Sequence, residues 1–127
     1  MILIDSSGWI EFFGDGKNAP KFSEYIKQAG KETHITPSVV VYEVFKKLSL
    51  MVGEEKALTA IAYMFNATTV IPLDGNQAVA SADTSIRFKL GMADAIIKTI
   101  ADARQAKIVT SDSDLKPFSN VIHIPKA

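Results

Sequence analysis

Several residue types and patterns are missing from this sequence, beginning with cysteine. None of the 127 residues is a cysteine, which excludes disulfides, thiolate metal sites and cysteine nucleophiles. The 14 basic and 14 acidic residues cancel, so a polyanion would have to be bound locally rather than by overall charge. The longest apolar run, VVVY before Glu43, is far too short to span a bilayer. The N-terminus has no basic region of the kind that opens a signal peptide, so we expect a cytoplasmic protein without a membrane partner.

Nucleotide-binding and hydrolase motifs are also missing. The sequence has no GxGxxG, GxxxxGK[ST] or GxSxG pattern. Its two histidines, His34 and His123, have no partner at metal-ligand spacing, and we expect structural roles for both.

What is present indicates a folded α/β protein. Hydrophobic residues make up 47% of the chain, and the length suits one domain over residues 1–127 with a sizeable core. The patterns predict strands over residues 1–4, 33–36, 68–73, 107–110 and 121–124, and helices over 6–13, 20–30, 37–51, 54–66, 77–90 and 93–106. This alternation predicts a three-layer α/β/α sandwich around a central parallel sheet of about five strands.

One stretch, LGMADAIIKTIADARQAKIVTSDSDL over residues 90–115, predicts a candidate site. About 14 helical residues span about 20 Å, and the extended residues after them run about the same distance in the opposite direction. Asp94, in the first helical turn, and Asp112, past the strand, therefore finish at the same end of the unit.

Two more acids are predicted at that end, beyond the carboxyl ends of the strands. Asp5 follows the first strand, and Glu43 lies in the second turn of the helix after the second strand. A lone carboxylate among valines, as Glu43 is, costs several kcal/mol unless it is protonated, paired with a base or bound to a cation. Converging carboxylates repel one another, and a divalent cation reverses that penalty. Oxygen ligands favour Mg²⁺ or Mn²⁺ over Zn²⁺, and such a site suits phosphodiester hydrolysis.

Each acid also has a simpler structural interpretation. Asp5 can cap the first helix, Asp94 can be a first-turn acid paired with Lys98, and Asp112 can be a turn residue. Glu43 can reach a buried lysine or arginine. The joint placement of the four acids favours the site.

Neighbouring polar residues leave alternatives open. Asp114 is a fifth ligand or a turn acid. Ser6 and Thr110 can orient ligands, although capping and strand propensity explain them as well. The basic residues near these helices can contact phosphates or lie on solvated helix faces: Lys46, Lys47, Arg87, Lys89 and Lys98.

Four segments in order, ILIDSSGWI, PSVVVYEVFKKL, MADAIIKTIA and IVTSDSDLKPF, resemble the PIN domain, most closely the short toxin ribonucleases of VapBC-type toxin–antitoxin pairs. The resemblance spans the whole chain and places the family's acidic ligands on Asp5, Glu43, Asp94 and Asp112, with Asp114 and Thr110 at supporting positions. Leu115 departs from the pattern, since many relatives carry an aromatic residue there, and we expect an effect on packing alone.

This resemblance implies a PIN-like fold with sheet order 3-2-1-4-5 and Mg²⁺- or Mn²⁺-dependent cleavage of RNA. It also implies a homodimer and a cognate antitoxin whose C-terminal segment enters the acidic groove. A patch for the second subunit can be formed by Phe22, Tyr25, Tyr63, Met64 and Phe65, although core burial explains these residues as readily.

Two other function classes compete with a toxin ribonuclease. A phospho-acceptor receiver domain is also a small parallel α/β protein, but it needs adjacent acids after the first strand, where Ser6 and Ser7 follow Asp5. A catalytically inactive PIN module that binds RNA or protein is the second alternative, and the intact acids argue against it.

Overall fold

The computed structural model describes residues 1–127 and contains one five-stranded parallel sheet in the order β3-β2-β1-β4-β5. The strands are β1 Ile2–Ile4, β2 His34–Pro37, β3 Thr69–Ile71, β4 Lys107–Thr110 and β5 Val121–His123. The helices are α1 Ser6–Phe13, α2 Ala19–Ile26, α3 Ser38–Val52, α4 Glu54–Ala67, α5 Gly75–Phe88 and α6 Met92–Ala103. The predicted fold class and strand order are confirmed.

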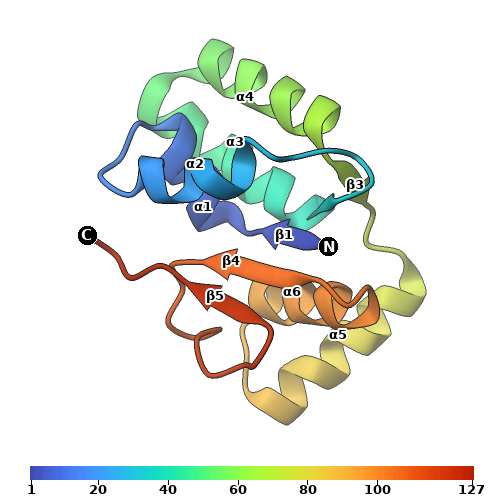
Figure 1. Cartoon of the computed structure of the whole chain (residues 1–127). Helices are drawn as coiled ribbons and strands as arrows, with labels where there is room; N and C mark the ends of the chain where they lie inside the picture. The colour runs from blue at the N-terminus through green and yellow to red at the C-terminus, as the bar shows by residue number, and fades with distance from the viewer.

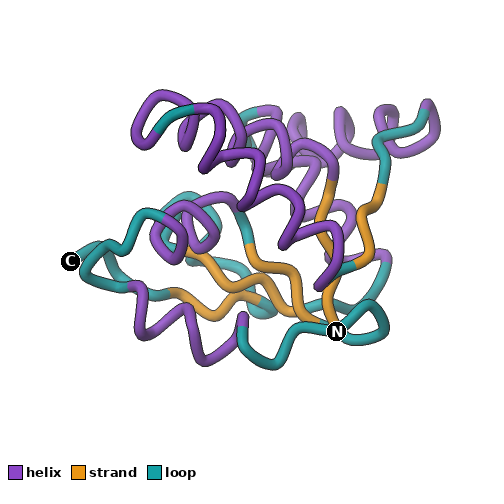
Figure 2. The backbone as a smooth tube through the Cα atoms, turned by 90° about the horizontal axis from the view of Figure 1, so that it is seen from above, coloured by secondary structure: helices purple, strands orange, loops and turns teal.

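The sheet lies between helices, as expected for buried parallel strands. Figure 1 shows α1 to α4 in the upper part of the molecule and the α5–α6 pair in the lower part. Figure 2, seen from above, shows helices on both sides of the strands. In Figure 1 the arrows of β1 and β4 point to the left, so their carboxyl ends lie on that side. None of the six helices combines the length with the apolar composition that a membrane span requires.

The pairing of β1 with its neighbouring strands and the packing of α1 position Asp5, which lies between β1 and α1. Leu3 of β1 pairs with Ile35 of β2 and with Ile108 of β4, so β1 is central in the sheet. Helix α1 begins directly after β1, and Gly8 lets it pack closely: a Cβ atom there would lie 2.6 Å from Ile4 Cγ2 and 2.8 Å from Phe22 Cδ1. Only glycine allows this approach without displacing the core.

The core includes some of the residues for which the sequence left burial and a dimer patch open. Trp9 is 1% exposed and Leu115 is fully buried, in keeping with a packing role for the latter. Of the predicted dimer patch, Phe22 and Met64 are also fully buried, so they belong to the core and are not available to a second subunit. Tyr63 and Phe65 remain 40% and 48% exposed.

Candidate metal centre

The Asp5 carboxylate lies at the end of β1 and is 3% exposed. Its Oδ1 accepts hydrogen bonds from the Ser7 hydroxyl at 2.5 Å and from the Gly8 amide at 3.3 Å. Its Oδ2 accepts one from the Thr110 hydroxyl of β4 at 2.5 Å. Asp5 therefore caps α1, as one interpretation of the sequence has it, and is also joined to β4.

Three more aspartates meet at the same end of the sheet. Asp94 is in the first turn of α6, while Asp112 and Asp114 follow β4. One carboxylate oxygen from each lies within 4.8 Å of those of the other two. Asp112 also accepts the Asp114 amide at 2.8 Å, so it is a turn residue as well as a member of the cluster. The structure therefore brings together Asp94 and Asp112, for which the sequence predicts this, and adds Asp114, for which the sequence left a ligand and a turn residue open; Asp5 and Glu43 are not members of this group of three.

The electrostatics of the cluster favour a positive ligand. Burial, opposed by hydrogen bonds from Ser7, Thr110 and Gly8, raises the pKa of Asp5 to about 6, and repulsion from Asp112 adds to the increase. Burial is also the largest reason that the pKa of Asp94 is raised to about 7. A hydrogen bond with Asp112 and repulsion from Asp112, Asp5 and Asp114 act in the same direction. The cluster thus holds protons where a cation could replace them.

The ion pairs that the simpler structural interpretations give to Asp94 and Glu43 are not formed. Lys98 pairs with Asp102 at 2.7 Å instead of with Asp94. Glu43 makes no salt bridge, because the two ion pairs of the chain are Lys98–Asp102 and Arg87–Asp83. Glu43 lies in the second turn of α3, is half-buried and makes no hydrogen bond, so its carboxylate is partly exposed to solvent.

Ser7, rather than the predicted Ser6, is the serine that contacts this site. Its hydroxyl donates to Asp5 and accepts the Ser111 amide at 2.9 Å, whereas the Ser6 hydroxyl makes no hydrogen bond. Thr110, the other predicted supporting residue, donates to Asp5 and accepts the Asp112 amide at 2.8 Å. The sequence signal for Ser7 is its position in the first turn of a helix capped by Asp5, where a side chain can fold back to the cap.

The donor set of the cluster fits a hard divalent cation. Asp94, Asp112 and Asp114 offer only carboxylate oxygens, and no histidine or cysteine joins them within the cluster. Ligands at about 2.1 Å from one ion lie up to about 4 Å apart, so shifts of less than about 1 Å would let these oxygens share it.

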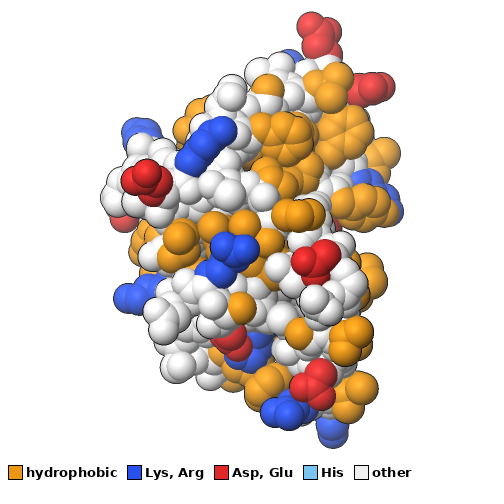
Figure 3. Space-filling view, turned by 90° about the vertical axis from the view of Figure 1, so that its right-hand side faces the viewer, with side chains coloured by type: hydrophobic (Ala, Val, Ile, Leu, Met, Phe, Trp, Pro, Cys, Tyr) orange, Lys and Arg blue, Asp and Glu red, His pale blue; other side chains and the backbone are white.

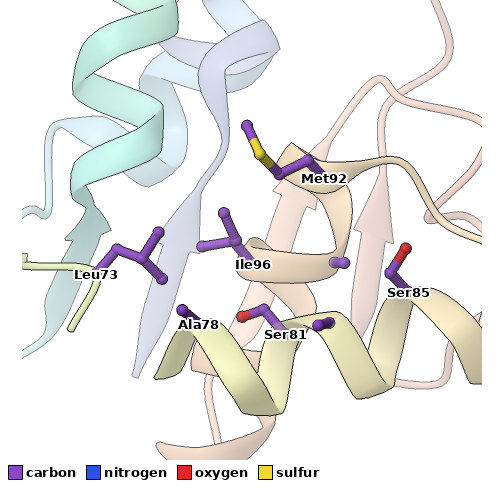
Figure 4. Close-up of a pocket in the computed structure, with 8 residues that line it drawn as sticks. Leu73, Ala78, Ser81, Ser85, Met92 and Ile96 are labelled. Carbon is purple, nitrogen blue, oxygen red and sulfur yellow. The ribbon is translucent and has the colours of Figure 1, made fainter. Parts of the chain in front are cut away.

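A separate apolar cavity lies between α5 and α6. Its volume is about 340 Å³, and Figure 4 shows Leu73, Ala78, Ser81, Ser85, Met92 and Ile96 around it. No charged residue lines it, so it offers no cation ligand.

Several solved structures share this fold. The chain resembles a toxin–antitoxin complex protein from Klebsiella pneumoniae with a TM-score of 0.77 and 18% identity, over 98% of this chain and 100% of that one. It resembles VapC20 of Mycobacterium tuberculosis, a toxin that cleaves the sarcin-ricin loop, with a TM-score of 0.76 and 15% identity, over 92% and 94% of the two chains. A third neighbour is VapBC2 from Rickettsia felis, bound to a DNA fragment, with a TM-score of 0.71, 16% identity and 98% of each chain covered.

A search of curated proteins found no match in sequence. The PIN domain family model, in contrast, matches residues 2–121, which is nearly the whole chain and includes each of the clustered aspartates. The protein therefore belongs to the PIN domain family.

Proposed function

We propose that this protein is a metal-dependent endoribonuclease and the toxin of a toxin–antitoxin pair. The observation that carries the proposal is the group of carboxylate oxygens from Asp94, Asp112 and Asp114 within 4.8 Å, without a basic partner in salt-bridge distance. Asp5 adds its charge from the end of β1. Glu43 is proposed as a further ligand from α3, on the strength of the motif that it shares with the family and its lack of a protein partner.

The residues at this site would bind the cation or position its ligands. Asp94, Asp112 and Asp114 hold the cation, and Asp5 and Glu43 complete the negative pocket around it. Ser7 and Thr110 fix the Asp5 carboxylate by hydrogen bonds, which limits its rotation. Bound Mg²⁺ or Mn²⁺ would supply a Lewis acid for the phosphoryl oxygens and an acidified water. Asp94, with its raised pKa, can hold a proton near neutral pH when no cation is bound.

Cleavage of RNA by the purified chain tests this proposal. We expect cleavage with Mg²⁺ or Mn²⁺ and none in EDTA, with structured RNA, single-stranded RNA and DNA compared in parallel. Asp94→Asn and Glu43→Gln should each lower the rate at least about 100-fold, because each removes charge from the pocket. Asp83→Asn, an exposed aspartate of α5 paired with Arg87, is the matched control and should cleave normally. Unchanged cleavage by Asp94→Asn would overturn the assignment.

We also propose an antitoxin and a second copy of the chain as partners. Solved structures similar to this fold include toxin–antitoxin complexes from several bacteria. Figure 3, which faces the right-hand side of Figure 1, shows hydrophobic side chains gathered over much of that surface with charged residues scattered among them. Co-expression with the product of the adjacent gene, followed by copurification and loss of RNA cleavage, tests the antitoxin. No observation favours a phospho-acceptor function, since Asp5 at the end of β1 is followed by Ser6 and Ser7 and not by a second acid.

A further inference from the structure

A second, basic pocket adjoins the acid cluster at the carboxyl end of the sheet. It has a volume of about 410 Å³, and Ser7 and Ser111 form part of its wall. Ser7 donates to Asp5, and Ser111 precedes Asp112 directly, so two lining residues of the pocket are direct neighbours of these acids. A molecule that lies in this pocket therefore also lies beside the proposed metal centre.

Three lysines from three distant parts of the sequence line the same pocket. Lys17 comes from the loop between α1 and α2, Lys47 from α3, and Lys126 from the C-terminal segment. Glu11 is the only acidic side chain of the lining, so the side chains carry three positive charges against one negative charge. None of the three lysines forms a salt bridge. Unpaired like charges around one concavity repel one another, and an anionic ligand relieves that repulsion.

The backbone around the pocket is fixed by hydrogen bonds. Asn18, which is 5% exposed, donates its side-chain amide to the Pro125 carbonyl at 2.8 Å. Its own backbone amide donates to Glu11 at 3.0 Å. Asn18 follows Lys17, and Pro125 precedes Lys126, so one buried side chain joins the two segments that carry these lysines. Lys47 is four residues after Glu43, one turn further along the same face of α3.

We propose that this pocket binds backbone phosphates of a single-stranded polynucleotide substrate next to the point of cleavage. Lysine is a point-charge ligand for phosphate, and phosphate contacts position a strand without reading its sequence. Lys17, Lys47 and Lys126 hold the strand, and the acids beside the pocket would hold the cation proposed above for cleavage of an adjoining phosphodiester. The inference rests on the proposed nuclease function, because that function defines what the acid cluster acts on.

Salt dependence of strand binding tests the pocket independently of catalysis. Binding of a fluorescent single-stranded RNA is measured in EDTA, in an Asp94→Asn background, at several KCl concentrations. The variant K17Q/K47Q/K126Q should reduce the slope of log Kd against log salt by about 2, since each phosphate contact contributes about 0.7 for a single strand. The matched control K27Q/K31Q/K56Q removes the same charge from exposed lysines outside the pocket and should retain the slope. Equal slopes for the two triple variants, or no binding by the parent, would overturn the proposal.

Kinetics of the active protein separate this inference from the proposed function. With Asp94 intact, K17Q/K47Q/K126Q should raise KM about tenfold or more and leave kcat within about twofold, because the lysines bind ground state and transition state alike. An unchanged KM for K17Q/K47Q/K126Q would also overturn the proposal that this pocket binds the substrate. If the chain bound RNA with the expected slopes but did not cleave it, the nuclease proposal would fail and the binding pocket would stand. Preference for an acidic peptide over RNA in the same binding assay would assign the pocket to a protein partner and overturn the proposal.

Discussion

Two hydroxyl groups, those of Ser7 and Thr110, hold the Asp5 carboxylate in place before any cation binds. The Ser7 hydroxyl also accepts the Ser111 amide, so it joins α1 to the segment that leads to Asp112. Removing such a group leaves an amide unsatisfied and lets the carboxylate rotate. Positioning groups behind metal ligands typically change metal affinity by about 10- to 100-fold.

We therefore expect Ser7→Ala to weaken Mn²⁺ binding about tenfold and to lower the free energy of unfolding by about 1 kcal/mol. Ser6→Ala, the neighbouring serine without a hydrogen bond, is the matched control and should change neither quantity. Calorimetric titration with Mn²⁺ and urea unfolding measure the two effects. Equal Mn²⁺ affinities in the two variants would show that Ser7 does not position the site.

The raised pKa values of Asp5 and Asp94 predict a pH dependence of stability without metal. Both pKa values, about 6 and about 7, lie above the ordinary aspartate value of 3.8, so the folded state binds these protons more tightly than the unfolded state. Their stabilising contribution is present at low pH and is lost as pH rises through about 6 to 7. Because Mn²⁺ binds the ionised forms, its stabilising effect should grow over the same range.

Asp94→Asn should consequently raise the metal-free unfolding free energy at neutral pH by about 1–2 kcal/mol, since it removes the cost of burying this charge and its repulsion from the neighbouring acids. It should also abolish most of the stabilisation by Mn²⁺. Thermal unfolding with and without Mn²⁺ at about pH 5 and about pH 8 checks both expectations. A Mn²⁺ effect on the parent chain that is larger at the lower pH would contradict the expected direction of this pH dependence.

The sequence reveals the clustered acids because they follow from strand ends and helix starts. Asp94 and Asp112 could be placed together from the lengths of a helix and a strand alone, and Asp5 from the end of β1. Ser7 could not be distinguished from Ser6, because which of two adjacent hydroxyls faces the cap depends on the rotation of α1 against the sheet. The half-buried state of Glu43 could not be predicted either. It depends on how α3 packs, and the apolar residues beside Glu43 in the sequence do not determine that packing.

The ends of two helices also could not be predicted from the sequence. Helix α6 stops at Ala103, three residues before the predicted end, because Gln105 adopts a left-handed conformation with φ 54°. The Ala106 amide then bonds to the Ala101 carbonyl at 2.8 Å and ends the helix. Glycine or asparagine normally signals such an end, and neither is present here. Helix α2 also stops early, at Ile26, where the chain turns towards β2.

The element that carries Asp94 is fastened to the loop after Asp112 by Lys98. This lysine of α6 is 7% exposed, and its Nζ lies 4.3 Å from the ring centre of Phe118 and 5.0 Å from that of Phe88. The two rings meet edge to face at 5.3 Å. Asp102 pairs with Lys98 at 2.7 Å and accepts a hydrogen bond from the Asn120 side-chain amide at 3.0 Å. Lys98 therefore contacts the loop at Phe118, and its partner Asp102 contacts the loop at Asn120.

We expect Lys98→Met to destabilise the fold by about 1–2 kcal/mol and to weaken Mn²⁺ binding, because the cation–π contacts and the partly buried ion pair are lost. Arg87→Met is the matched control: it breaks an ion pair of the same spacing whose side chains are 70% and 60% exposed. Its cost should stay below about 1 kcal/mol. Urea unfolding compares the two, and a cost for Lys98→Met no greater than for Arg87→Met would contradict this role of the lysine.

Exposed apolar residues on α5 and α6 provide a surface for the proposed second copy. Val79, Ile86 and Met92 are 73%, 78% and 74% exposed, so both helices leave large apolar side chains uncovered. Val79 and Ile86 are seven residues apart on one side of α5. Each follows directly a residue that lines the apolar cavity, Ala78 or Ser85, so the surface and the cavity adjoin.

A dimer through this surface should be broken by Ile86→Glu, because a two-fold axis places the new carboxylate in the interface twice. Leu50→Glu is the matched control, since Leu50 is 79% exposed on α3, away from α5, and should leave the dimer intact. Light scattering gives the mass of each variant in solution, and thermal unfolding verifies that both remain folded. If Leu50→Glu produced monomers and Ile86→Glu did not, the second copy would bind α3 instead. A monomeric parent chain would exclude the dimer altogether.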